Sequence, residues 1–334
     1  MNNMPSTLPI RNWYPTRLRI HQQDVWCEWV HLADIPFTDP FFDETLAKAR
    51  SSPINSSRFR PASTIDVLDN WSRSLTYIPP TAFIFHVSRC GSTLLSQLLG
   101  LHPLCISLAE VPFFDDIIRL PFKAEAPTGV DVSETLAAAI RLYGQQRLSH
   151  ERHLFVKLDS WHIFFWRQLR ALYPDVPFIL LYRRPNEVLR SHRKLRGMHA
   201  IPGLIEPAVF GFNPEETPSI ALDEYIAQVL ERYFSAYLDV VSEDRMAVLL
   251  NYEEGPLAFV RSVAASCGMA LDDAYLGEVA KRSAFHGKHP GMVFSENSEP
   301  LVAEPHLDAA FRLYNQLERL RLQPTVEKTK DKLD

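Results

Sequence analysis

The sequence lacks the features that mark several classes of protein. Its four cysteines lie far apart in 334 residues and form no CxxC pair, which argues against a zinc knuckle and a disulfide framework. No run approaches the ~18 apolar residues of a membrane-spanning helix, and the N-terminus lacks the apolar core of a signal peptide. The net charge of -5 gives no overall attraction to nucleic acid or to anionic membranes. We therefore expect a cytoplasmic protein that binds neither of them.

Most of the chain alternates between short runs of β-forming residues and segments of helical periodicity. Four runs are short, apolar and bounded by turn-forming residues, as buried strands are: Ala82–Val87, His153–Lys157, Val176–Tyr182 and Met246–Tyr252. Helical segments separate them, and this alternation is typical of a parallel sheet covered by helices. The sequence therefore predicts an α/β fold with a central parallel sheet. The hydrophobic content of 46% is that of an ordinary globular protein.

We divide the chain into three parts. Residues 77–325 form the α/β domain, and residues 326–334 form a short charged tail. Residues 1–76 are rich in aromatic residues and turn formers, and Arg17–Ile20 and Val25–His31 have the character of short strands. We therefore predict that residues 1–76 form a small β-rich appendage. Two roles are open for it: packing against the α/β domain, or covering a substrate site as a lid.

A short polar turn, Ser88–Thr93, joins the first predicted strand to the helical segment Leu94–Leu101. The first N–H groups of a helix have no partner within it, and the helix dipole is positive at that end, so such a junction favours anions. Gly91 lets the backbone approach an anion closely, and the two hydroxyl residues after it add donors. Arg89 adds a fixed positive charge with a planar set of donors. The turn is therefore a candidate phosphate or sulfate site.

The turn lacks the lysine of an ATP-binding Walker A loop. A Walker A sequence reads GxxxxGK[ST], whereas Ser92 stands here in place of the lysine and His86 in place of the first glycine. Transfer of the highly charged γ-phosphate of ATP relies on that lysine and on Mg²⁺. A sulfuryl group carries less charge and can dispense with both. We expect no metal, and we keep an ATP-dependent P-loop kinase or phosphotransferase as an alternative.

Two segments resemble the nucleotide motifs of the sulfotransferase family. FHVSRCGSTLLSQLL is similar to the family's 5′-phosphosulfate loop, with Cys90 in place of the usual serine, and ILLYRRPNEVLRSH is similar to its 3′-phosphate motif. The resemblance covers about residues 80–295. It implies a three-layer P-loop fold that binds 3′-phosphoadenosine 5′-phosphosulfate (PAPS). The implied PAPS-binding residues are Arg89, Cys90, Gly91, Ser92, Thr93, Arg183, Ser191 and, from a loosely matching late loop, Lys288.

The same resemblance suggests two catalytic residues. Glu110 lies in an apolar stretch at the position of the glutamate base of carbohydrate-type sulfotransferases, and burial there would raise its pKa towards a useful value. Lys157 ends the predicted strand HLFVK and would stabilise the phosphate oxygen that leaves. His162 is the alternative base, as in the soluble phenol-type members, and Asp159 would orient the lysine.

The sequence thus predicts a sulfotransferase that moves a sulfuryl group from PAPS to a hydroxyl, or to an amine. The product of PAPS is 3′,5′-adenosine bisphosphate (PAP). A non-catalytic module that binds PAP is a further alternative beside the kinase. The expected acceptor is a small molecule or a carbohydrate-like compound, and the oligomeric state stays open.

Overall fold

The computed structural model describes residues 10–285, 287 and 304–323. Five strands form a central sheet in the spatial order β5-β6-β4-β7-β8, and every neighbouring pair is parallel. The strands are β4 (Pro80–His86), β5 (Cys105–Ala109), β6 (His153–Lys157), β7 (Phe178–Tyr182) and β8 (Ala247–Asn251). The inner strands are buried along almost their whole length, as expected of a parallel sheet covered on both faces. The predicted α/β fold is confirmed.

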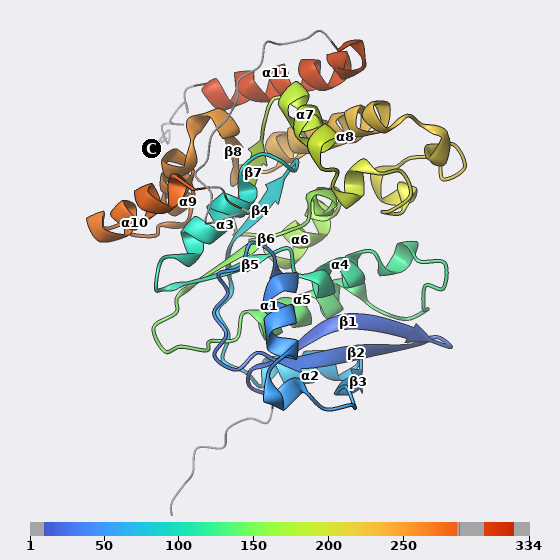
Figure 1. Ribbon diagram of the computed structural model, residues 1–334, viewed down its shortest axis with the longest axis vertical. Coiled ribbons are helices and arrows are strands. Elements are labelled where there is room, and N and C mark those ends of the chain that lie inside the picture. The colour runs from blue at the N-terminus through green and yellow to red at the C-terminus, as the bar shows by residue number, and fades with distance from the viewer. Residues whose placement is uncertain (1–9, 286, 288–303, 324–334) are drawn as a thin grey trace, which may run out of the picture.

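Helices cover the two faces of this sheet and give three layers (Figure 1). On one face lie α3 (Ser92–Gly100), α9 (Pro256–Cys267) and α10 (Asp273–Ser283). On the other lie α8 (Leu222–Glu243) and α11 (Asp308–Leu322). Connecting helices are α4 (Pro112–Ile118), α5 (Val132–Tyr143), α6 (Trp166–Leu172) and α7 (Pro185–Lys194). Within the described ranges, no helix has both the length and the apolar character needed to cross a membrane.

The N-terminal part forms a second, antiparallel sheet of three strands in the order β1-β2-β3. Its elements are β1 (Trp13–His21), β2 (Asp24–His31), β3 (Ala62–Thr64), α1 (Phe42–Arg50) and α2 (Val67–Arg73). The predicted β-rich appendage is therefore confirmed. The third strand was not predicted, because its three residues lie in a Ser- and Pro-rich stretch and pair with β2 only through the tertiary fold.

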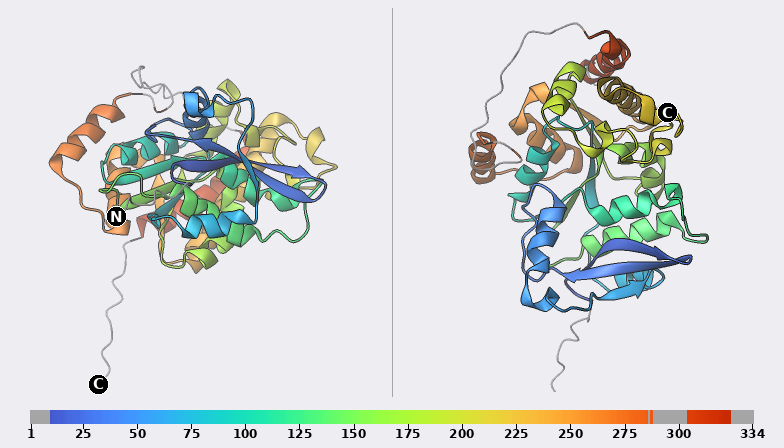
Figure 2. Two further views of the ribbon diagram at one scale, coloured as in Figure 1. Left: turned by 90° about the horizontal axis from the view of Figure 1, so that it is seen from below. Right: turned by 45° about the vertical axis from the view of Figure 1, so that its right-hand side comes forward.

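The N-terminal sheet packs against α4 and α5 of the α/β domain (Figures 1 and 2). Arg147, just after α5, tethers the loop that follows β2. Its guanidinium donates to the carbonyl oxygens of Ala33 and Ile35, both at 2.8 Å, and lies 4.6 Å from the ring centroid of Phe37. A single charged side chain thus satisfies two loop carbonyls and joins the two parts of the protein.

Replacement of Arg147 by alanine is expected to loosen this joint. The change removes two hydrogen bonds from a charged donor, so the free energy of unfolding should fall by about 2 kcal/mol. Urea unfolding measures the loss. Arg152→Ala is the control, because within the described part of the chain the exposed Arg152 side chain bonds only the nearby carbonyls of Ser149 and Glu151. An equal loss of unfolding free energy in the two variants would contradict the idea that Arg147 joins the two parts of the protein.

Candidate active site

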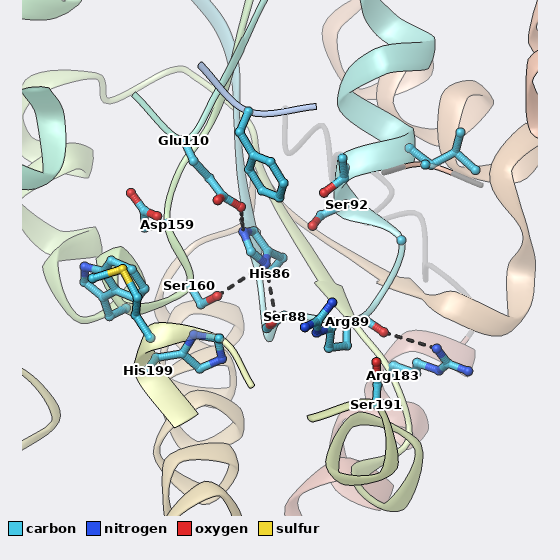
Figure 3. A pocket seen from close by; sticks show the side chains of 18 of the residues that line it. His86, Ser88, Arg89, Ser92, Glu110, Asp159, Ser160, Arg183, Ser191 and His199 are labelled. Atoms are coloured by element: carbon cyan, nitrogen blue, oxygen red, sulfur yellow. Dashed lines mark hydrogen bonds and ion pairs between the residues drawn. The ribbon is translucent and has the colours of Figure 1, made fainter. Parts of the chain in front are cut away.

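The segments that follow four neighbouring strands meet at one cavity of about 1110 Å³. Ser88 follows β4, Glu110 follows β5, Asp159 follows β6 and Arg183 follows β7, and all four line the cavity (Figure 3). In open α/β sheets, ligands bind at this carboxyl edge of the strands. The fold therefore places the predicted nucleotide motifs and the predicted acid in one space.

The turn between β4 and α3 has a strained backbone. Ser88 and Arg89 have φ values of 67° and 53°, in the left-handed region that costs a non-glycine residue about 1–2 kcal/mol. The N–H of Ser88 donates to Nδ1 of His86 at 3.1 Å, which pins the start of the turn. Strained backbone of this kind persists where the surrounding structure enforces it, as at ligand sites.

Gly91 is required by both its conformation and its surroundings. Its φ is 85°, and a Cβ placed there would lie 3.2 Å from Cδ2 of Tyr252. Such a contact is closer than ordinary packing allows, so the ring would have to move. The structure therefore needs glycine here for its conformation and for its packing against Tyr252, and the close approach of the backbone to an anion stays a prediction.

The N-terminus of α3 faces the cavity without a competing group. The helix has no side-chain cap and no acidic residue in its first turn, and Ser92 and Thr93 both line the cavity. The side chain of Cys90 instead points into the core, where its thiol donates to the carbonyl of Leu181 at 3.4 Å. Burial raises the pKa of Cys90 to about 11, so the thiol stays protonated and Cys90 can contribute only its backbone.

Arg183 connects the two nucleotide motifs. It donates to the carbonyl of Arg89 at 3.2 Å, pairs with Glu187 at 2.7 Å, and stacks with its Cζ 3.9 Å from the ring centroid of Tyr252. Ser191, two turns along α7, lines the same cavity (Figure 3). The fold thus brings the phosphate turn and the second motif together, as the sequence predicted.

Glu110 forms a buried ion pair with Lys157, and Nε2 of His86 lies 3.1 Å from the same carboxylate oxygen. Burial alone would raise the pKa of Glu110, but Lys157 and His86 outweigh it and hold that pKa well below its ordinary value. The expectation of a raised pKa is therefore wrong, because the sequence did not reveal how closely Lys157 approaches.

Lys157 and His162 lie behind the cavity wall rather than in it. Lys157 is 0% exposed, and its ammonium contacts Glu110 and lies 5.4 Å from the ring centroid of Phe41. His162 is 1% exposed, with Nε2 at 3.1 Å from Oδ1 of Asp115. A group so enclosed cannot reach a substrate hydroxyl, so the geometry argues against His162 as the base.

Asp159 does line the cavity, but it does not pair with Lys157 as the sequence suggested. Burial, together with the negative charges of Glu110 and Asp115, raises the pKa of Asp159 well above its ordinary value. Its Oδ2 lies 3.9 Å from Nε2 of His162. The cavity thus holds two carboxyl groups whose environments move their pKa values in opposite directions.

The N-terminal part contributes directly to the cavity wall. Arg17 of β1, and Phe41 and Asp43 at the start of α1, all line it. Asp116 of α4 fixes this contact, since it accepts a hydrogen bond from the N–H of Leu18 at 2.9 Å and lies 3.6 Å from Arg17. Of the two roles open to this segment, the substrate-facing one gains support from this placement.

One cluster in the described part of the chain has the spacing of metal ligands. Ligand atoms of Asp115, Asp159 and His162 lie within 4.8 Å of one another. Asp115, however, is already paired with Arg119 at 2.7 Å and accepts from the indole of Trp161 at 2.6 Å. His162 and Arg119 hold the pKa of Asp115 near 2 against the effect of burial. We assign this cluster no ligand.

Sequence reasoning missed several residues of the site. His86 and Tyr252 line the cavity, as does His199 from the loop after α7. His86 stands within the first nucleotide motif but was considered only as a departure from the Walker A sequence, whereas only the tertiary fold brings Tyr252 and His199 to the two motifs. The predicted Lys288 lies outside the described residues, whereas Phe285 and Gly287 from the same loop line the cavity.

No protein-family model matches the chain, and no curated protein matches it in sequence. In structure it is similar to the sulfotransferase STF9 from Mycobacterium avium, with 15% identity, coverage of 84% of each chain and a TM-score of 0.50. The chain has a sulfotransferase fold. It is also similar to the sulfotransferase domain from the curacin biosynthetic pathway, with 14% sequence identity and a TM-score of 0.47. The match covers 73% of this chain and 99% of that domain.

A third similar structure is mouse sulfotransferase SULT7A1 complexed with PAP, with 10% sequence identity and a TM-score of 0.38. The match covers 78% of this chain and 88% of that chain. At 15% identity the likeness to STF9 establishes the sulfotransferase fold alone. The resemblance read from the two sequence motifs is confirmed at that level, and donor, acceptor and activity are matters of proposal.

Removal of either partner of the Glu110–Lys157 pair is expected to destabilise the protein more than removal of both. Glu110→Gln leaves a buried ammonium without its counter-charge, a change that costs about 3–5 kcal/mol of unfolding free energy. The double variant Glu110→Gln, Lys157→Met removes both charges and should recover much of that loss. Urea unfolding of the two single variants and the double variant measures the coupling. Additive losses would show that the pair is not coupled.

Gly91→Ala is expected to weaken PAP binding as well as the fold. The left-handed φ costs alanine about 1 kcal/mol, and the new Cβ also meets Tyr252 in the cavity wall. Gly268→Ala is the matched control, because Gly268 has a φ of 67° and no atom within 4 Å of its Cβ position. Calorimetric titration with PAP should separate the two variants, while thermal unfolding shows similar losses. Equal PAP affinity would contradict the role of Gly91.

Proposed function

We propose that this protein is a sulfotransferase that moves the sulfuryl group of PAPS to a hydroxyl, or to an amine, of an acceptor. The observation that carries the proposal is the convergence of two motifs on one cavity. The start of α3, which has no side-chain cap, lines the cavity with Arg89, Ser92 and Thr93. Arg183 and Ser191 of the second motif line the same cavity. An anion site alone fits many ligands, whereas two linked anion sites suit a nucleotide with phosphates at both ends.

The residues present fit the donor chemically. Free N–H groups at the start of a helix bind a phosphosulfate through its oxygens, and the absence of an acid in that turn avoids repulsion. Arg89 supplies a charge for the same group. Arg183 and Ser191 would hold a second phosphate, with Arg183 leaving Glu187 for the stronger anion.

Glu110 and Lys157 act in this proposal as one buried pair beside the reacting group. From behind the cavity wall, Lys157 adds a positive electrostatic potential while negative charge builds up on the departing phosphate oxygen. A base works best with a pKa near the operating pH, so the depressed pKa of Glu110 disfavours it as the proton acceptor. We propose that Glu110 instead holds Lys157 and His86 in place, and that another group of the cavity takes the proton.

The kinase alternative has less support. Ser92 occupies the position of the Walker lysine, and the two acids Glu110 and Glu187 pair with Lys157 and Arg183. A phosphoryl donor with its higher charge would lack the lysine that it normally meets in a P-loop protein.

Calorimetric titration tests the donor site. PAP is expected to bind at least tenfold more tightly than AMP, which lacks the 3′-phosphate. Arg183→Ala and Ser191→Ala should reduce that preference. Arg193→Ala is the control on the same helix, since Arg193 pairs with Asp223 and Glu304 away from the cavity. A protein that binds ATP and PAP equally, with or without Arg183, would not be a PAPS-dependent sulfotransferase.

A further inference from the structure

The N-terminal part places in the cavity wall a basic side chain whose hydrogen-bond donors are unused. The guanidinium of Arg17, on β1, lies 3.7 Å from a carboxylate oxygen of Asp43 and 3.6 Å from one of Asp116. Both distances are too long for a hydrogen bond, and among the described residues no group accepts one from this side chain. Since Arg17 lines the cavity and its side chain is 39% exposed, its donors are open to a ligand.

The register of the N-terminal sheet explains why Arg17 is left open. The pairing of β1 with β2 shifts between Pro15 and Arg17, and a bulge of this kind changes the direction of a side chain. Arg17 stands opposite Glu28 of β2, but Glu28 accepts from Arg19 at 2.8 Å and from Arg60 at 3.4 Å. The acid that could neutralise Arg17 within its own sheet is therefore taken, and Arg17 reaches towards α1 and α4 instead.

Two other basic side chains near α4 line the cavity, and both already have hydrogen bonds. Arg119 donates to Asp115 and to Glu206, both at 2.7 Å. Lys123 donates to Glu206, also at 2.7 Å. Arg17 differs from these two because it can bind a ligand without first giving up a hydrogen bond within the protein.

Asp116 offers a hydrogen-bond acceptor beside these donors. Its Oδ2 accepts from the N–H of Leu18 at 2.9 Å, whereas its Oδ1 has no hydrogen bond within the described ranges and lies 3.6 Å from Arg17. Burial raises the pKa of Asp116, as expected of a carboxyl that water reaches only in part. A ligand that removes this water must replace its hydrogen bonds, or binding is weakened. A donor and an acceptor thus line the cavity side by side.

The charges of this group disfavour several kinds of ligand. An anionic group would meet the carboxylates of Asp43 and Asp116 beside the guanidinium, and a cationic group would meet Arg17 beside the carboxylates. An apolar group would displace water from Arg17 and Asp116 without replacing its hydrogen bonds. A hydroxyl both donates and accepts. Two neighbouring hydroxyls can therefore bond the guanidinium and the carboxyl at once, with no net charge.

The same group lies next to the reacting part of the cavity. Phe41, close to Asp43 at the start of α1, also lines the cavity, and Nζ of Lys157 lies 5.4 Å from its ring centroid. Asp116 belongs to α4, the helix that follows Glu110, and β1 packs against that helix (Figure 1). The cavity volume of about 1110 Å³ exceeds the range of about 300–1,000 Å³ that is usual for one small ligand. Donor and acceptor can therefore occupy it together.

We propose that Arg17 and Asp116 bind two neighbouring hydroxyl groups of the acceptor and so select a sugar or another polyol over a simple phenol or alcohol. The inference rests on the proposed function. The guanidinium donates to the hydroxyl oxygens, and Oδ1 of Asp116 accepts from one of the hydroxyls. Arg17 precedes the segment, about residues 80–295, whose motifs resemble the sulfotransferase family, so this selection is a property of the N-terminal part of this chain.

The first test measures acceptor binding without turnover. Methyl β-glucoside, methyl β-galactoside, myo-inositol and cyclohexanol are each titrated into the PAP complex, and saturation-transfer NMR measures their affinities. At least one of the three polyols is expected to bind more tightly than cyclohexanol. Arg17→Ala and Asp116→Asn should each weaken the binding of that polyol about tenfold, the scale of a lost hydrogen bond to a charged group.

Arg19→Ala is the matched control. Arg19 lies on the same strand as Arg17 but pairs with Glu28, and an exposed ion pair of this kind contributes little. Its polyol affinity should therefore equal that of the unaltered protein, and PAP affinity should not change in any of the three variants. Equal losses in Arg17→Ala and Arg19→Ala overturn the inference. Failure of all three polyols to bind a protein that binds PAP overturns it as well.

The second test measures turnover of two phenols that differ in the polyol. Arbutin carries a glucose in place of the methyl group of 4-methoxyphenol, so the acidities of the two phenolic hydroxyls are similar. With ³⁵S-labelled PAPS, kcat/KM for arbutin should exceed that for 4-methoxyphenol about tenfold. Arg17→Ala should abolish this difference by raising KM for arbutin. An equal effect on both phenols would mean a structural role and overturn the inference, as would the absence of a preference for arbutin in the unaltered protein.

Charged phenols distinguish this inference from a site for a charged acceptor. Near neutral pH, 4-hydroxyphenylacetate is an anion and tyramine is a cation. If Arg17→Ala raises KM for 4-hydroxyphenylacetate instead of arbutin, or Asp116→Asn raises KM for tyramine instead of arbutin, the group binds a charge and the inference is wrong. Failure of the proposed function looks different: PAP does not bind, or no ³⁵S reaches any of these phenols while a polyol still binds through Arg17.

Discussion

A buried ion pair joins the carboxyl ends of three neighbouring strands. Lys157 is the last residue of β6, Glu110 follows β5, and His86 is the last residue of β4. The backbone reinforces the pair, because the N–H of Glu110 donates to the carbonyl of Lys157 at 2.9 Å. Glu110 holds a φ of 54°, which costs free energy and is maintained by these contacts. The phosphate turn Ser88–Thr93 follows His86 and donates to it through the N–H of Ser88, so the position of the turn depends on the pair as well.

Arg183 fixes the position of the phosphate turn on the other side of β4. It extends from the end of β7 to the carbonyl of Arg89 in the phosphate turn and stacks on Tyr252, which follows β8. The turn is thus held from both sides by charged side chains. Arg183 is also a ligand candidate, so an incoming anion would compete with Glu187 for it. The same interactions therefore shape the cavity and set the charge that a ligand meets.

The sequence predicted the parts of the fold that local pattern determines. The strands that became β4, β6, β7 and β8 are short apolar runs between turn formers, and their bounds agree with the structure to within about two residues. β5 was not predicted, because Cys105–Ala109 is short and leads directly into Glu110. The pKa of Glu110 could not be predicted, since it depends on Lys157, 47 residues away in the chain.

The two sides of the cavity differ in how much the sequence reveals of them. The donor side is built from contiguous motifs, a strand followed by a turn and a helix, so its residues keep recognisable spacings. The opposite side is assembled from β1, the start of α1, α4 and the loop that carries His199, segments far apart in the sequence. No spacing rule links them, and a small change in any one reshapes the space. A resemblance between sequence motifs can therefore predict the donor but not the acceptor, because the acceptor is selected by a cavity wall that forms only in the folded protein.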